Sequence, residues 1–192
     1  GLDKETELKQ LRVMRQLNES HPVDIVSTYM GAHALPTEWK GRKDAFIAFQ
    51  IEEMFPLVVQ QKLAEAVDIF CEKGVFSIEQ SRRYLQAAHE QGFQLKMHAD
   101  EIVPLAGAEL AAELGCLSAD HLLQASNKGI RALAETGTVA TLLPLTAFSL
   151  REKYARAREM IDAGCIVALA TDLNPGSSFT ASVPLLFALA CI

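Results

Sequence analysis

The sequence alternates between short apolar segments and longer segments with helical spacing, and this alternation is the strongest constraint on its fold. The apolar segments have the β-branched and aromatic character of strands. Six strand-then-helix units follow one another without a tandem repeat or a linker. Strict alternation with mostly apolar strands predicts a parallel sheet covered by helices. The expected strands are residues 23–30, 66–70, 93–97, 116–119, 138–143 and 165–170.

Helices are expected before, between and after these strands. Ser77 is a predicted N-cap because Gln80 follows three residues later, and Gly92 is the predicted stop of that helix. The expected helices are residues 3–19, 43–62, 77–91, 102–114, 127–135, 150–163 and 184–192.

Two α/β architectures fit this alternation, an open doubly wound sheet and a (β/α)8 TIM barrel. The open sheet usually carries a Gly-rich phosphate turn after its first strand, and residues 30–33 do not form one. A complete barrel needs eight units in about 250 residues. About six units in 192 residues therefore predict one partial barrel domain over residues 1–192.

The two ends of the sequence favour a fragment of a longer protein. The chain starts at Gly1 in a helical pattern and stops at Ile192 in an apolar segment without a C-cap signal. The missing barrel units are expected before Gly1.

The composition is that of an ordinary globular protein with a large core, at 49% hydrophobic and 22% charged residues. The net charge of −6 and the absence of a Lys/Arg run argue against a nucleic-acid partner. No signal-peptide pattern or 18-residue apolar run is present, so no membrane segment is expected. Four cysteines in apolar surroundings, without a C-x-x-C motif, predict reduced, buried thiols in a cytoplasmic protein.

Polar side chains follow four of the expected strands at the point where each strand ends. They are His33, His98, His121 and Asp172. The carboxyl ends of barrel strands meet at one rim, so these side chains are expected to converge. Imidazole and carboxylate form the ligand set of Zn²⁺ or Fe²⁺, which generate a nucleophile from bound water. The sequence therefore predicts a metal-dependent hydrolytic site.

Other polar residues near these strand ends have two interpretations each. Glu101, three residues after His98, is either a proton carrier or a carboxylate favoured at a helix N-terminus. Asn174, Gly176 and Ser177 are expected at a helix start, where amide, backbone N–H and hydroxyl groups suit an anionic substrate group. An ordinary Asn-Pro-Gly-Ser turn explains the same residues.

Five short motifs occur in order along the chain, at residues 31–36, 97–101, 118–122, 142–148 and 170–177. Together they resemble the imidazolonepropionase family of the amidohydrolase superfamily, which acts in histidine degradation. The resemblance covers essentially the whole chain, and the combination of motifs is specific to this family. It implies hydrolysis of the cyclic amide C–N bond of 4-imidazolone-5-propanoate to N-formimino-L-glutamate.

The resemblance also implies a role for each rim residue. His98 and Asp172 would be metal ligands, and Glu101 would contact the substrate ring and manage its protons. His121 would polarise the substrate or assist proton transfer together with Asp172. Residues lining the substrate site would be His33, Asn174, Gly176 and Ser177.

One divalent metal, Zn or Fe, is implied because Cys71 and Glu72 stand where dinuclear superfamily members carry a bridging lysine or another ligand. The family's His-x-His pair on the first barrel strand is absent, and so is its small β domain. The 192 residues alone are therefore expected to bind metal weakly and not to turn over. For the full-length enzyme the resemblance implies a homodimer acting on a small molecule, imidazolone propionate.

Two alternatives remain open at this point. Another ring-acting amidohydrolase, of the cytosine or guanine deaminase type, would share the rim chemistry and differ at His33 and the 174–177 turn. A catalytically inactive barrel segment used for assembly or binding would hold no metal in a full-length chain.

Overall fold

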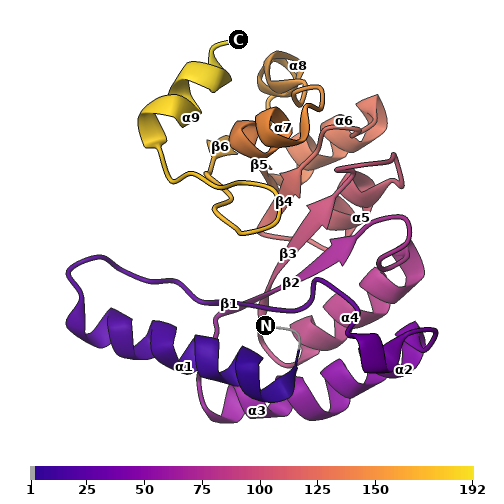
Figure 1. The fold of residues 1–192 in the computed structure, drawn as a ribbon. Helices are drawn as coiled ribbons and strands as arrows, with labels where there is room; N and C mark the ends of the chain where they lie inside the picture. The colour runs from indigo at the N-terminus through magenta and orange to yellow at the C-terminus, as the bar shows by residue number, and fades with distance from the viewer. Residues whose placement is uncertain (1–2) are drawn as a thin grey trace. The chain divides into compact units, whose positions relative to one another are not determined.

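The structure is a computed structural model that describes residues 3–192 in two compact units (Figure 1). The first unit extends to Met97, and the second runs from His98 to Ile192. Within the described residues no helix is both long and apolar enough to cross a bilayer. Each unit is described below by itself.

The first unit pairs two parallel strands and covers them with helices. Thr28 is opposite Ala66 and Tyr29 is opposite Val67 in the parallel ladder of β1 and β2. The elements are α1 (Lys4–Ser20), β1 (Thr28–Ala32), the 3₁₀ turn η1 (Thr37–Trp39), α2 (Lys43–Phe49), the π-helical turn η2 (Gln50–Met54), α3 (Phe55–Gln60), β2 (Ala66–Cys71) and α4 (Ile78–Glu90).

The core of the first unit is aromatic. The Phe55 ring lies 4.8 Å from the ring of Tyr84 and 5.4 Å from that of Phe93, measured between centroids. Tyr29 meets Phe55 edge-on at 6.3 Å, and its hydroxyl donates a hydrogen bond to Gln50. Burial raises the pKa of both tyrosines well above the ordinary value.

The second unit continues the same pattern with three further parallel strands. β4 pairs with β5 through Asp120 opposite Thr141, and β5 pairs with β6 through Leu142 opposite Leu169. β3 (Gln94–Ala99) ends in this unit, and its other elements are α5 (Gly107–Glu113), β4 (Ser118–His121), α6 (Asn127–Thr136), β5 (Val139–Leu142), α7 (Pro144–Leu150), α8 (Ala157–Asp162), β6 (Val167–Leu169) and α9 (Val183–Ala190).

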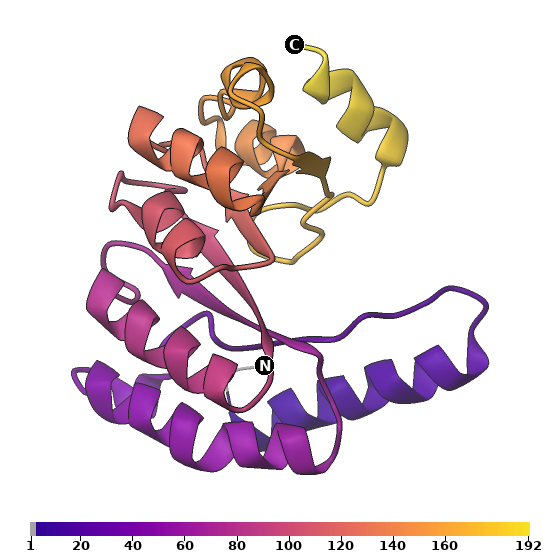
Figure 2. The same ribbon diagram turned by 180° about the vertical axis from the view of Figure 1, so that it is seen from behind.

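Close approach of two helices organises the second unit. Helices α5 and α6 lie side by side (Figure 2). A Cβ atom added to Gly129 would lie 2.8 Å from both the Ala108 Cβ and a Glu109 carboxylate oxygen. Glycine at this position therefore permits the close contact. Ser126 caps α6 by accepting the Gly129 N–H and also donates to Glu109.

The order of the strands distinguishes the two expected architectures. The described strands follow the chain in the order β1-β2-β3-β4-β5-β6. A doubly wound sheet reverses its strand order at a switch point, whereas a barrel adds each strand beside the previous one. The sequential parallel order is that of a (β/α)8 barrel with about six units. The expectation of a single domain stays a prediction.

Several boundaries confirm the sequence analysis, and others correct it. The capping box of α4 is present, with Ser77 and Gln80 bonded reciprocally at 3.2 and 3.1 Å. The expected strand at residues 23–30 was wrong in its first part, because pairing begins only at Thr28. Three cysteines are buried as expected, but Cys191 is exposed.

Two expected helices differ from the structure. The helix expected at 102–114 begins only at Gly107, because the preceding loop bonds to the Asp100 carboxylate instead. The helix expected at 150–163 is wrong, since α7 ends at Leu150 and α8 begins at Ala157. Arg151 between them adopts a left-handed conformation with φ of 59°, which ends α7.

Candidate active site

The candidate site lies in the second unit, where the strands β3 to β6 end. His98 lies near the end of β3, and His121 is the last residue of β4. The two loops that follow are joined by backbone hydrogen bonds from Leu122 N to Ala99 O (3.1 Å) and from Gln124 N to Asp100 O (2.8 Å). These bonds hold the ends of β3 and β4 together.

His121 is the centre of this cluster. Its Nδ1 atom lies 3.5 Å from Glu101 Oε1, and its Nε2 atom lies 3.9 Å from Asp172 Oδ2. The His121 side chain is 3% exposed and that of Glu101 is 9% exposed, whereas that of Asp172 is 21% exposed. One imidazole thus stands between two carboxylates, one buried and one partly open to solvent.

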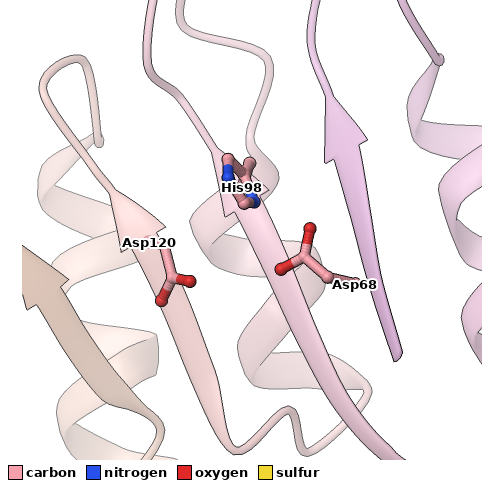
Figure 3. A group of neighbouring side chains, drawn as sticks. All are labelled: Asp68, His98 and Asp120. Atoms are coloured by element: carbon pink, nitrogen blue, oxygen red, sulfur yellow. The ribbon is translucent and has the colours of Figure 1, made fainter. Parts of the chain in front are cut away.

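His98 adds a second imidazole to the cluster. Its ring lies 5.1 Å from that of His121, centroid to centroid, at an interplanar angle of 46°. A ligating nitrogen of His98 and a carboxylate oxygen of Asp120 lie within 4.8 Å of each other. Figure 3 shows His98 at the end of β3 and Asp120 on the neighbouring β4. His98, Asp120, His121 and Glu101 are all buried.

The backbone at these strand ends adopts left-handed conformations that non-glycine residues rarely visit. Asp100, His121 and Asp172 have φ values of 49°, 73° and 49°. Such residues cluster at functional sites, where the surrounding structure holds them in place. The strand ends therefore combine left-handed backbone conformations with buried imidazole and carboxylate side chains.

Asp100 stabilises the loop that carries Glu101. Its buried carboxylate accepts hydrogen bonds from the backbone N–H groups of Leu105 (2.8 Å), Gly107 (3.1 Å) and Ala108 (2.9 Å). Bonds from backbone N–H groups to a carboxylate are charge-assisted and strong. The loop after β3 is thus folded around an aspartate that the sequence analysis did not select.

Thr146 is a second residue that the sequence analysis missed. It lies in the first turn of α7, is 1% exposed, and its hydroxyl donates a 2.7 Å hydrogen bond to Asp172 Oδ2. The available signal was a threonine within the otherwise apolar run at residues 142–148, where a hydroxyl needs a hydrogen-bond partner if it is buried. The partner of that hydroxyl is known only from the fold.

The turn after Asp172 is already organised by its own side chains. Asn174 Oδ1 accepts the backbone N–H groups of Gly176 and Ser177, both at 2.8 Å, and the Ser177 hydroxyl lies 3.2 Å from Oδ1. The expectation that these residues start a helix is wrong, because α9 begins at Val183. They form an Asx-type turn beside Asp172.

His33 lies in the first unit, directly after β1. Its ring stacks on that of Phe70 at a centroid distance of 5.1 Å. Asp68 also belongs to the first unit, as a buried carboxylate on β2 (Figure 3). A single carboxylate within an apolar strand is the sequence signal that could have selected Asp68, since its burial needs compensation.

Comparison with curated proteins identifies the relatives of the chain. An imidazolonepropionase of Bacteroides thetaiotaomicron is 70% identical over 194 positions, covering 100% of this chain and 46% of that protein. An imidazolonepropionase of Phocaeicola vulgatus is 66% identical, covering 100% of this chain and 47% of that protein. The chain belongs to the imidazolonepropionase family. It spans about half the length of the curated relatives it matches. No protein-family model matches the chain.

Solved structures give the fold of this imidazolonepropionase-family chain. A guanine deaminase from C. acetobutylicum, with guanine in its active site, superposes with a TM-score of 0.73 at 14% identity, covering 98% of this chain and 48% of that one. An adenosine deaminase from Xanthomonas campestris, with bound zinc, gives 0.69 at 17% identity, covering 94% and 44%. Together with the sequential parallel strands, these likenesses identify the fold as a partial TIM barrel.

The donors of the second unit fit a divalent metal of the zinc or iron class. His98 offers an imidazole nitrogen, and Asp120 and Asp172 offer carboxylate oxygens. Neutral imidazole and carboxylate suit these ions, and catalytic zinc sites use three protein ligands of this kind. The chain thus presents imidazole and carboxylate donors of suitable chemistry at these strand ends, with His98 and Asp120 buried and Asp172 partly exposed.

Proposed function

We propose that this chain carries the proton-transfer half of an imidazolonepropionase active site. The proposed reaction is hydrolysis of the cyclic amide C–N bond of 4-imidazolone-5-propanoate, which yields N-formimino-L-glutamate. The observation that carries this proposal is the line of Glu101, His121 and Asp172, with His121 between the two carboxylates. Identity of 70% to an imidazolonepropionase over the whole chain supports the choice of substrate.

The proposal includes one divalent metal, Zn²⁺ or Fe²⁺, held by His98 and Asp172. When bound, such an ion lowers the pKa of a water molecule and polarises a carbonyl oxygen. Second-shell hydrogen bonds orient ligands of this kind and tune their basicity. Asp172 already has such a partner in the Thr146 hydroxyl.

Glu101 and His121 would move the protons of the reaction. Hydrolysis adds a water oxygen to the ring carbonyl carbon, breaks the C–N bond, and returns a proton to the departing ring nitrogen. Glu101 would accept the proton from water and then donate it to the ring nitrogen, because a carboxylate placed at the reacting atoms can act first as a base and then as an acid. His121 would donate to the developing oxygen charge or relay a proton to Asp172.

His33 and the 174–177 turn would bind the substrate. We assign the planar ring of His33, which stacks on Phe70, to the wall of the substrate site. Asn174, Gly176 and Ser177 would bind the polar ends of the substrate, and the hydrogen bonds within the turn support a pre-organised shape. A cytoplasmic location and a homodimer in the full-length enzyme complete the proposal.

The test compares substrates on the purified protein at its full natural length. We expect loss of imidazolonepropionate, abolished by a chelator and restored by Zn²⁺ or Fe²⁺. Ammonia release from guanine or cytosine, without reaction of imidazolonepropionate, would instead support a deaminase. Metal content near zero with no activity would support an inactive segment used for assembly.

A second measurement uses the 192-residue chain alone. We expect weak metal binding and no turnover, because the chain lacks a His-x-His pair. Turnover comparable with that of the full-length protein would contradict this expectation.

A further inference from the structure

In the proposed function, Asp172 would contact both the metal and His121. Its side chain is the most exposed of the three in the Glu101–His121–Asp172 line. It also stands in a loop beyond the end of β6, at a φ of 49°. A partly exposed carboxylate in such a loop can rotate about its side-chain torsions unless a neighbour fixes it. The structure offers one neighbour that does this.

That neighbour is Thr146. Its hydroxyl donates to Asp172 Oδ2 at 2.7 Å, the length of a charge-assisted O–H···O⁻ bond. Oδ2 is the same oxygen that lies 3.9 Å from His121 Nε2. The bond therefore constrains the carboxylate oxygen that faces the catalytic imidazole.

Thr146 itself has little freedom. It is 1% exposed, and its backbone N–H bonds to Leu143 O at 3.1 Å in the first turn of α7. Pro144 begins this helix directly after β5, with its backbone torsion fixed by the ring. A β-branched side chain in a helix also has few side-chain rotamers. The hydroxyl is thus presented from a rigid position.

We propose that Thr146 is a positioning residue that holds the Asp172 carboxylate in one orientation for the metal and for His121. This inference rests on the proposed function, since it assigns Asp172 its two tasks. Thr146 touches neither substrate nor metal and acts only through Asp172.

The test uses the isosteric change Thr146→Val, which removes the hydroxyl and keeps the branched shape. Its matched control is Thr136→Val in the same unit, where the threonine hydroxyl contacts backbone carbonyls of its own helix and lies 3.1 Å from the Thr138 hydroxyl, with no carboxylate partner among the described residues. Thr146→Ser returns the donor and serves as the rescue. All three are made in the protein at its full natural length.

Two readouts separate positioning from simple loss of stability. The first is the dissociation constant of Co²⁺, followed by its visible absorption against a chelator. The second is kcat and KM with imidazolonepropionate. We expect Thr146→Val to weaken Co²⁺ binding and lower kcat by about 10- to 100-fold each, with KM little changed. Thr146→Ser should recover most of both, and Thr136→Val should match the wild type.

The outcomes distinguish this inference from the proposed function. Wild-type levels of Co²⁺ affinity and kcat in Thr146→Val would overturn the positioning role and leave the function standing. Weakened Co²⁺ binding in a protein that does not hydrolyse imidazolonepropionate would support positioning and overturn the substrate assignment. A wild-type protein that takes up no Co²⁺ would overturn both. If Thr146→Val does not fold, Thr146→Ala and Thr146→Ser are compared by the same Co²⁺ titration, and equal affinities would overturn the role.

Discussion

The two units of this chain share the parallel α/β pattern but differ in the side chains that they bring together. In the first unit, the rings of Tyr29, Phe55 and Tyr84 fill the interior, and the hydroxyl of Tyr84 has no hydrogen-bond partner among the described residues. In the second unit, the strand ends carry buried imidazoles and carboxylates that interact with one another. The core of the first unit thus buries aromatic surface, whereas the second unit brings ionisable side chains together at its strand ends.

This difference teaches that stability and activity should respond to separate sets of residues. Aromatic packing contributes in proportion to the area and the contacts removed from water. A hydrogen-bonded polar cluster contributes little net stability but fixes the geometry on which proton transfer depends. Four variants, ordered by size of effect, test this division.

The largest effect is expected at His121. His121→Asn in the full-length protein should lower kcat by about 10²- to 10⁴-fold, the usual contribution of a general acid–base group. Asparagine tolerates the left-handed backbone found at this position, so the fold should persist. The control is His89→Asn at an exposed position in α4, which should leave kcat unchanged. Equal kcat values for the two variants would break the comparison.

The next effect is on stability and is expected at Phe55. Phe55→Ala should cost about 3–5 kcal/mol in the free energy of unfolding, because it leaves a cavity among three aromatic rings. Phe148→Ala, at a side chain that is 56% exposed, should change it by less than about 0.5 kcal/mol. Urea unfolding measures both values. A loss of kcat in the folded fraction of Phe55→Ala would show that the residues for stability and the residues for activity are not separable.

A smaller cost is expected where α5 meets α6. Gly129→Ala should destabilise the second unit by about 1–3 kcal/mol, since the added methyl would overlap Ala108 and Glu109. Lys128→Ala, at the exposed neighbouring position, should change stability by less than about 0.5 kcal/mol. Thermal unfolding of both variants checks this. A neutral Gly129→Ala would mean that the helices can move apart without cost.

The smallest effect concerns the pH dependence of the aromatic unit. Burial raises the pKa of Tyr84 well above its ordinary value of 10.0, so the folded protein keeps a proton that the unfolded chain loses. Stability contributed by this group is therefore present below about pH 10 and is lost as the pH rises further. Tyr84→Phe should reduce this alkaline loss and change stability at neutral pH by less than about 1 kcal/mol.

Unfolding free energies of Tyr84→Phe and the wild type, measured from neutral pH upwards, provide the test. Identical slopes for the two proteins above about pH 10 would contradict the prediction.

Local signals in the sequence were sufficient for most of the fold. The alternation of apolar and helical segments predicted a partial barrel, and Ser77 with Gln80 predicted the start of α4. The expected helix start near residue 102 failed because the Asp100 carboxylate binds backbone groups up to eight residues away. Such a competing interaction is invisible to helical periodicity.

The sequence analysis selected several ionisable side chains that lie together at the strand ends, but it did not select Asp120 or the residues that support the cluster. His98, His121 and Asp172 stand out because a charged or ionisable side chain follows an apolar strand. Thr146 does not stand out, because its importance depends on an oxygen 26 residues away in the chain. The role of Asn174 as the organiser of its own turn likewise depends on backbone torsions that the residue types alone do not determine.

The sequential parallel order of the strands also has a kinetic consequence. Parallel neighbours are joined by crossover connections, so their contacts close long loops and form slowly. The Thr146–Asp172 contact closes such a loop and joins the ends of β5 and β6. Metal uptake should therefore develop late during refolding, after most helical signal has returned, and should report completion of the rim rather than collapse of the chain.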